Sequence, residues 1–165
     1  MESAKNQVRL KCSLVLIPRK ERLCLENCVF CRIARKEEHA SFVYEDQDVV
    51  AFLDSRPVNE GHTLVVPRKH YENIFEVPDE EVAHLFKIVK KLAYAVSKSE
   101  KAEGISLVQN NGIAARQIVF HFHVHIIPRY EGQDSHSPRG TAEQNELDRV
   151  AAKIRKFLTA SNMNH

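Results

Sequence analysis

Three histidines at alternate positions, His121, His123 and His125, stand out in this 165-residue chain as residues whose spacing suits chemistry. They lie in the stretch HFHVHIIPR, where apolar residues fill the positions between them. Side chains of a strand alternate between its two faces, so the three imidazoles are predicted to share one face. The other face, from Ile118 to Ile126, would be wholly apolar and would pack on the core. A lone strand histidine is usually structural, whereas this threefold alternation indicates a reactive or metal-binding site.

Two kinds of chemistry suit such a row of imidazoles. Histidines two positions apart on a strand lie about 6.7 Å from each other and can share a metal, but the outer pair, about 13 Å apart, cannot easily do so. Alternatively, one imidazole acts as a nucleophile, since its reference pKa of about 6.5 leaves it largely neutral at pH 7. Attack on phosphorus would give a phosphohistidine-type intermediate and divide one difficult displacement into two steps.

A second group of candidate ligands lies near the N-terminus, because all four cysteines fall within the first fifth of the chain. Cys28 and Cys31 have the two-residue gap typical of a zinc site, which needs two more ligands for tetrahedral coordination. In a reducing compartment, this clustering favours metal binding or reduced thiols over a disulfide framework. Cys24 and His39 are competing ligands that the spacing leaves open.

The elements that must position these groups follow from the hydrophobic periodicity. Strands are predicted at 42–44, 49–53, 63–66, 105–108 and 118–127, with the first two as a hairpin and the last as the longest. Apolar residues at helical spacing predict amphipathic helices over 79–98 and 143–158. The predicted fold class is therefore α+β, an antiparallel sheet of about five strands with two main helices.

Length and composition indicate a single domain at 28–165, preceded by an N-terminal extension at 1–27 with a strand-like piece at 14–17. The formal net charge is +2 without a long basic run, which argues against duplex nucleic acid or a membrane surface as a partner. The apolar run at 12–17 is too short to span a bilayer, and the basic residues after it do not fit a signal peptide. We therefore expect a cytoplasmic protein.

Four stretches together resemble the histidine-triad (HIT) superfamily of nucleotide hydrolases and transferases, in its zinc-carrying bacterial and archaeal branch. They are CVFCRI (28–33), VYEDQDVVAFLD (43–54), PVNEGHTLVVPRKH (57–70) and QNNGIAARQIVFHFHVHIIPRY (109–130), in the family's order and spacing. The resemblance implies a HIT-like fold and an AMP-like nucleotide as the ligand. It also implies cleavage at the α-phosphate of nucleoside phosphoramidates or dinucleoside polyphosphates, and a homodimer, which is common in the family.

The resemblance further implies a role for each matching residue. His123 would attack the α-phosphate, His125 would bind phosphate oxygens beside it, and His62 would support the nucleophile. Asp54 would accept hydrogen bonds from both ribose hydroxyls. The residues that would wall the base pocket or hold the phosphates and leaving group are Phe30, Ile33, Phe52, Leu53, Asn110 and Gln117, with backbone amides near 112–119. The reaction itself would need no metal.

In the zinc-carrying members, the two remaining zinc ligands are a histidine after the third strand and the first histidine of the triad. Those positions are His70 and His121 in this chain. The resemblance therefore implies a structural zinc bound by Cys28, Cys31, His70 and His121, which ties the N-terminal segment to the sheet. His123 would then be available for chemistry, so that one strand serves two sites.

Two residues depart from the family pattern. Arg116 stands where glycine is usual; glycine lets the backbone approach phosphate, whereas arginine could pair with phosphate or narrow the site. Ile118 replaces a serine or threonine able to donate a proton to the leaving group. Beside a hydrolase that forms nucleotidyl-His123, two alternatives therefore remain: a nucleotide-binding module with little turnover, and a zinc-dependent scaffold in which the triad only supports metal.

Overall fold

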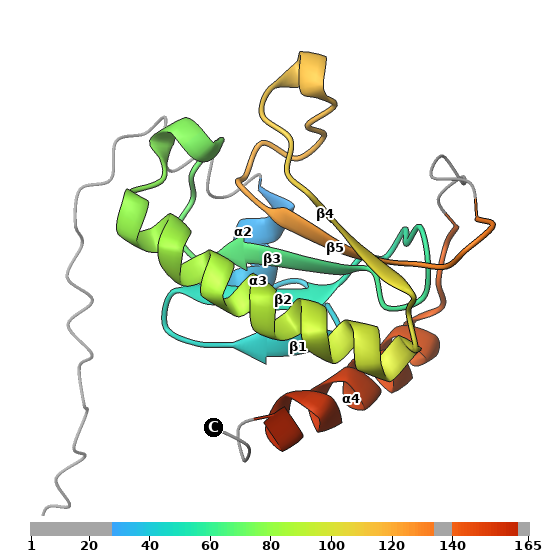
Figure 1. The fold of residues 1–165 in the computed structure, drawn as a ribbon. Helices are drawn as coiled ribbons and strands as arrows, with labels where there is room; N and C mark the ends of the chain where they lie inside the picture. The colour runs from blue at the N-terminus through green and yellow to red at the C-terminus, as the bar shows by residue number, and fades with distance from the viewer. Residues whose placement is uncertain (1–27, 134–139, 162–165) are drawn as a thin grey trace, which may run out of the picture.

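The computed structural model describes residues 28–133 and 140–161. In chain order, its elements are α2 (Val29–Ala34), β1 (Phe42–Glu45), β2 (Val49–Leu53), β3 (Thr63–Pro67), the 3-10 turn η1 (Ile74–Glu76), α3 (Asp79–Glu100), β4 (Gly104–Val108), the 3-10 turn η2 (Ile113–Ala115), β5 (Val124–Arg129) and α4 (Gln144–Ser161). All five strands form one antiparallel sheet in the order β1-β2-β3-β5-β4. The predicted α+β class with two main helices is confirmed (Figure 1). The strand-like piece at 14–17 and Cys24 lie outside the described residues.

Alternation along β2 sends its side chains into two apolar layers. Val49, Ala51 and Leu53 pack in the larger core cluster with residues of α3 and α4. Val50 and Phe52 point the other way and pack with α2 in a smaller cluster. Figure 1 shows the same division, with the long helices α3 and α4 on one side of the sheet and the short α2 on the other.

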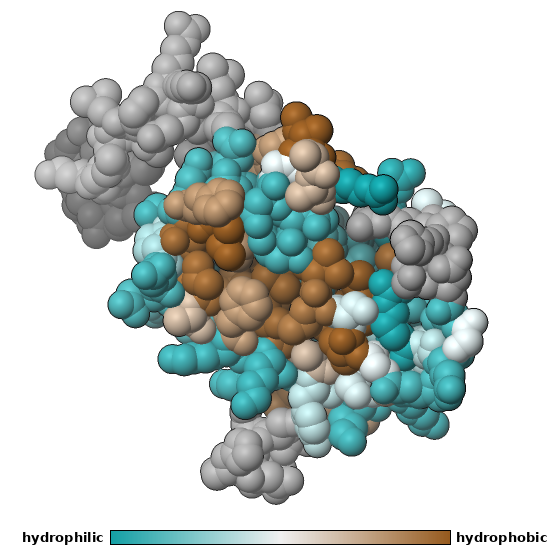
Figure 2. All heavy atoms as spheres, turned by 45° about the horizontal axis from the view of Figure 1, so that its top comes forward, coloured by the Kyte–Doolittle hydropathy of each residue, from teal (hydrophilic) through white to brown (hydrophobic). Residues whose placement is uncertain are grey.

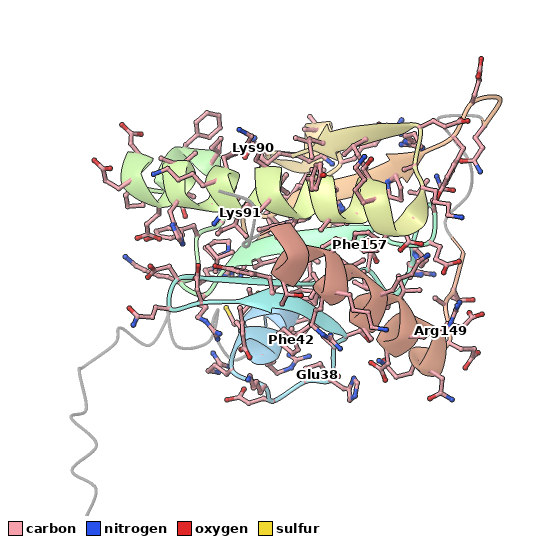
Figure 3. The ribbon with its side chains drawn as sticks, turned by 60° about the horizontal axis from the view of Figure 1, so that its bottom comes forward. Glu38, Phe42, Lys90, Lys91, Arg149 and Phe157 are labelled. Carbon is pink, nitrogen blue, oxygen red and sulfur yellow. The ribbon has the colours of Figure 1, made fainter. Side chains whose placement is uncertain are left out.

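The helix α3 forms a long cover because its apolar residues recur at helical spacing and bury one face. Three acidic residues in its first turn, beginning with Asp79, suit the positive end of the helix dipole. The helix ends at Lys101, whose left-handed backbone (φ 53°) closes the last turn. Lys90 and Lys91 lie exposed on its outer side, and α4 packs beside it (Figure 3). Within residues 28–133 and 140–161, no helix is long and apolar enough to cross a membrane.

The predicted strand at 118–127 is wrong over its first half, because β5 begins at Val124 and continues to Arg129. The β3–β5 ladder runs only from Thr63 to Val65, and two residues further along β3 stands Pro67, which has no N–H to donate. The segment before β5 is bonded outside the ladder, because the Phe122 N–H donates to the carbonyl of Tyr71, which follows β3.

The side chains at the start of this segment are consequently not in the core. Ile118 is 79% exposed and Phe120 is 40% exposed, although the alternation predicted that both would be buried. From Phe122 onward the prediction holds, since Phe122, Val124 and Ile126 are fully buried against the α3 layer. The histidines therefore sit where an irregular loop becomes a central strand.

Candidate active site and metal centre

The start of β5 carries His123 and His125 to the α2 side of the sheet. His125 is paired in register with Leu64 on β3 and Val108 on β4, so a neighbouring strand fixes its backbone on each side. The two imidazole rings lie edge to face with their centroids 4.8 Å apart, and each residue is 6% exposed. The pair is therefore nearly buried and held in a defined arrangement.

The orientation of His123 follows from one hydrogen bond. Its Nδ1 lies 2.5 Å from the backbone carbonyl oxygen of His121. A carbonyl can only accept, so Nδ1 carries the proton and Nε2 keeps its lone pair. The edge of the Phe30 ring packs against His123 at 5.1 Å between centroids and helps to fix the ring. This tautomer is the one that a nucleophilic Nε2 requires.

A short relay sets the tautomer of His125. The backbone N–H of Val58 donates to His62 Nδ1 at 3.2 Å, so His62 carries its proton on Nε2. That proton is donated to His125 Nδ1 at 3.0 Å, which leaves His125 with its proton on Nε2 as a donor. Asp54 Oδ2 lies 3.7 Å from His62 Nε2. His62 is therefore hydrogen-bonded to His125, and the Asp54 carboxylate lies near both rings.

His123 and His125 line a cleft of about 480 Å³, a size typical of small-molecule sites. Several of the other predicted site residues line the same cleft: Phe30, Ile33, Phe52, Leu53, Asp54 and Asn110. Apolar residues of α2 and β2 form one wall, and the connection from β4 to β5 supplies polar groups. An apolar wall beside two histidines and a carboxylate suits a ligand with a flat ring, hydroxyls and an anionic group.

Gln117 is the predicted phosphate contact that the structure does not bring to this lining. Its side-chain amide donates to the backbone carbonyls of Glu72 (2.6 Å) and Val119 (3.2 Å). Its side-chain oxygen accepts the backbone N–H of Gly112 at 2.7 Å. Gln117 therefore braces the loop between β4 and β5 from within.

The cleft also contains polar residues that the sequence did not indicate. They are Ser41, Ser55, Arg56 and Gln144. Gln144 begins α4 and donates to the Ser41 hydroxyl at 2.7 Å, which fastens the helix to the chain just before β1. His39, considered above as a competing metal ligand, lines the cleft instead. Ser55 and Arg56 directly follow Asp54, whereas Gln144 and Ser41 meet only because α4 packs against β1.

The four predicted zinc ligands converge on the other side of His121. Cys28 Sγ and Cys31 Sγ lie 3.3 and 3.5 Å from His121 Nδ1, Cys31 Sγ lies 3.3 Å from His70 Nδ1, and the two Nδ1 atoms are 3.3 Å apart. Sulfur and nitrogen ligands around a tetrahedral zinc ion lie roughly 3.3–3.8 Å from one another. The donor set and its spacing therefore fit zinc.

The protonation of these ligands fits a cation as well. Hydrogen bonding with Cys31 is the largest cause that lowers the pKa of the Cys28 thiol to about 2; contacts with His121 and His70 add to it, and burial opposes it. His121 Nε2 lies 2.9 Å from the Pro67 carbonyl, so Nε2 carries the proton and Nδ1 offers a lone pair. Thiolate and neutral imidazole are the forms that bind zinc.

The chain is similar in sequence to known proteins. The HIT domain matches residues 35–132. An uncharacterized HIT-like protein of Methanocaldococcus jannaschii is 48% identical over 128 residues, which cover 78% of this chain and 98% of that protein. The adenylylsulfatase HINT3 of Arabidopsis thaliana is 40% identical over 105 residues, which cover 64% of this chain and 53% of that protein.

Solved structures show the same fold. A hypothetical histidine triad nucleotide-binding protein from Sulfolobus tokodaii has a TM-score of 0.76 at 40% identity, covering 81% of this chain and 93% of its own. A Zn-bound histidine triad family protein from Mycobacterium smegmatis has a TM-score of 0.77 at 31% identity, covering 86% and 99%. With a domain match over more than half of its length and relatives of this similarity, the chain belongs to the HIT, or histidine-triad, family of nucleotide-binding proteins.

Proposed function

We propose that this protein is a hydrolase that cleaves nucleoside phosphoramidates or dinucleoside polyphosphates at the α-phosphate through a nucleotidyl-His123 intermediate. The observation that carries this proposal is the 2.5 Å hydrogen bond from His123 Nδ1 to the His121 carbonyl, at a residue that lines the cleft. It reserves the Nε2 lone pair for attack on phosphorus. An adenylylsulfatase among the relatives shows that this family includes enzymes that act on an adenylyl group.

The reaction would proceed in two displacements. In the first, His123 Nε2 forms a bond to the α-phosphorus, the bond to the leaving group breaks, and its electron pair leaves with that group. The imidazole then carries a positive charge, which strengthens its hydrogen bond to the His121 carbonyl. In the second, water attacks phosphorus and releases a proton to solvent, the P–N bond breaks with its electron pair returning to Nε2, and neutral His123 is restored. His125 Nε2–H would donate to a phosphate oxygen in both transition states.

The rest of the cleft would bind an AMP-like nucleotide. Phe30, Ile33, Phe52 and Leu53 would wall the base, and Asn110 would donate to phosphate. Asp54 would accept hydrogen bonds from the ribose hydroxyls. Its Oδ1 already accepts the Arg56 backbone N–H at 2.9 Å, a bond that fixes the direction of the carboxylate.

Zinc would be held by Cys28, Cys31, His70 and His121 and would supply structural cross-linking of α2 to β3 and β5. A closed site with four protein ligands has no open position for substrate. In that arrangement the metal contributes to folding rather than to the reaction. A reducing cytoplasmic setting would keep both thiols available as ligands.

We also propose a homodimer, with no duplex nucleic acid or membrane partner. The strand β4 lies at the edge of the sheet and carries Leu107, which is half exposed. Phe86 and Tyr94 are exposed on the neighbouring helix α3. Figure 2 shows hydrophobic residues gathered in a patch on this face. An exposed edge strand beside an apolar patch is a typical site for pairing with a second copy.

The test compares wild type with His123→Ala on adenosine phosphoramidate and diadenosine polyphosphate. We expect turnover to fall at least about 1000-fold while AMP binding stays within about tenfold, because only the covalent route is removed. A quenched reaction of wild type should show one nucleotidyl group on His123 by mass spectrometry. Full activity of the variant would exclude the mechanism. A wild type that binds AMP without turnover would indicate the binding module, and loss of metal in His123→Ala would indicate the scaffold.

A further inference from the structure

Arg116 holds a backbone conformation that arginine rarely adopts. Its φ is 63°, in the left-handed region, where it closes the turn η2 through a bond from its N–H to Ile113. Glycine takes this conformation without steric cost, whereas a side chain is strained there. The next residue, Gln117, is anchored to three backbone groups. These bonds therefore fix the backbone from which the exposed Arg116 side chain extends.

The side chain of Arg116 adds positive charge to the cleft beside the nucleophile. Among the described residues, the lining contains two guanidinium groups, on Arg56 and Arg116. The two carboxylates of the lining have other partners, since Glu38 pairs with Arg32 at 3.4 Å and Asp54 lies 3.7 Å from His62. Arg116 is on the connection that leads to His123, and it lines the same cleft as the apolar residues of α2 and β2.

The same connection contains no proton donor at the next cleft-lining position. Ile118 is 79% exposed and lines the cleft with Arg116 and His123. An amine that leaves from phosphorus takes the electron pair of the P–N bond and must gain a proton. Isoleucine has no proton to donate, and a guanidinium remains charged in proteins and does not give one up. A phosphate or sulfate, by contrast, leaves as a stable anion without a proton.

We propose that Arg116 binds the leaving group and makes the enzyme prefer nucleotidyl donors that release an oxyanion, such as a phosphate, polyphosphate or sulfate, over those that release an amine. This inference rests on the proposed function. As His123 Nε2 attacks, the P–O bond to the leaving group breaks and its electron pair stays on the leaving oxygen. The guanidinium forms charge-assisted hydrogen bonds to that anion, which are stronger than bonds to a neutral group.

The test measures kcat/KM of Arg116→Gly and Arg116→Lys on adenosine 5′-phosphosulfate, diadenosine triphosphate and adenosine 5′-phosphoramidate. Arg116→Gly should lower the values for the two anion-releasing substrates about 10- to 100-fold and change the phosphoramidate value less than about threefold. Arg116→Lys should recover part of the loss. The matched control is Lys101→Gly, which removes a basic residue at φ 53° from the end of α3 and should leave all three values unchanged.

Two results would overturn the inference while leaving the proposed function intact. One is a wild type that prefers the phosphoramidate, and the other is an equal change for all three substrates in Arg116→Gly. Failure of the proposed function looks different, because wild type would then hydrolyse none of the three substrates and form no nucleotidyl-His123. A thermal melt of each variant separates loss of folding from loss of rate.

Discussion

The imidazole of His121 faces the ligand atoms of Cys28, Cys31 and His70, while its backbone carbonyl accepts the Nδ1–H of His123 at 2.5 Å. One residue therefore belongs to both groups of side chains. Contacts of the His121 imidazole with the cysteines and His70 hold this residue in place, and its carbonyl in turn orients the His123 ring. A change at the cysteines can therefore reach His123 through the His121 backbone, and we expect its effect on the reaction to be small, because the carbonyl itself is unchanged.

Replacing a zinc ligand should affect stability much more than chemistry. We expect one tightly bound zinc ion per wild-type chain, and expect Cys28→Ser or chelation to lower Tm by several degrees or more. Where the variant remains folded, kcat should stay within about tenfold of wild type, because the His121 carbonyl still accepts from His123. Elemental analysis, thermal melts and kinetics below the transition measure these effects.

His123→Ala is the matched control for the metal content and should keep its zinc. A metal-free wild type with unchanged stability would remove the zinc proposal. It would leave the His123 mechanism standing, since that mechanism depends on the tautomer and not on a metal.

The relay from Val58 through His62 to His125 predicts a positioning role for His62. Removing the ring in His62→Ala leaves His125 Nδ1 without the donor that fixes its tautomer. We expect kcat to fall about tenfold or more while the AMP Kd changes less than about threefold, together with an altered pH profile of kcat. His62→Gln retains an N–H donor on a longer side chain and should recover part of the rate. An equal loss in kcat and binding, with an unchanged pH profile, would mean a purely structural role.

Local periodicity is enough to predict the two long helices, α3 and α4, and the outer strands, but not the short helix α2 or the beginning of β5. The helix α3 was predicted nearly to its ends because its apolar spacing is continuous over the whole element. The start of β5 depends instead on Pro67 in another strand, which has no N–H for the ladder. Alternation along one strand cannot reveal whether the neighbouring strand has a backbone N–H available to pair with it.

In the candidate site too, some features follow from a local motif and others depend on residues far away in the sequence. His123 and His125 are candidates from a local motif, and the carbonyl that sets the His123 tautomer is only two positions away, whereas the tautomer of His125 depends on a partner far away in the sequence. His62 lies 63 positions from His125, and Gln144 lies 103 positions from Ser41, to which it is hydrogen-bonded in the cleft. Gln117, predicted at the phosphate, instead hydrogen-bonds backbone groups of Glu72, Gly112 and Val119.

Acid should weaken the turn between β1 and β2 through Asp46. Burial alone would raise the pKa of Asp46, but hydrogen bonds from the Asp48 and Val49 amides, and from His84 and Tyr44, hold it below its usual value. A depressed pKa contributes stability that is complete above the unfolded pKa of about 3.9 and is lost as the pH falls through the folded value. Asp46→Asn should therefore cost about 1 kcal/mol at pH 7 and progressively less below about pH 4.

Urea titrations of both proteins from pH 7 to pH 3 measure this difference. The exposed neighbour Asp48 provides the control, and Asp48→Asn should change the unfolding free energy by less than about 0.5 kcal/mol. A difference between wild type and Asp46→Asn that does not shrink in acid would show that the charge of Asp46 contributes nothing.

Replacing Gly61 with alanine tests the cost of steric overlap separately from the cost of backbone strain. It also tests the position of His62, which is the next residue. Its φ is 87°, and a Cβ there would lie 2.6 Å from Glu100 Cγ. That side chain cannot easily move, since Lys153 pairs with its carboxylate at 3.0 Å and the Ser99 hydroxyl donates to it at 2.9 Å.

Gly132 is the matched control. Its φ is 78° and nothing lies within 4 Å of its Cβ position, so an alanine there adds backbone strain without steric overlap. Gly132→Ala should cost about 1–2 kcal/mol and Gly61→Ala about 1–3 kcal/mol more, measured by urea unfolding. Gly61→Ala should also lower kcat by displacing His62, and equal costs at the two positions would mean that Glu100 yields without resistance.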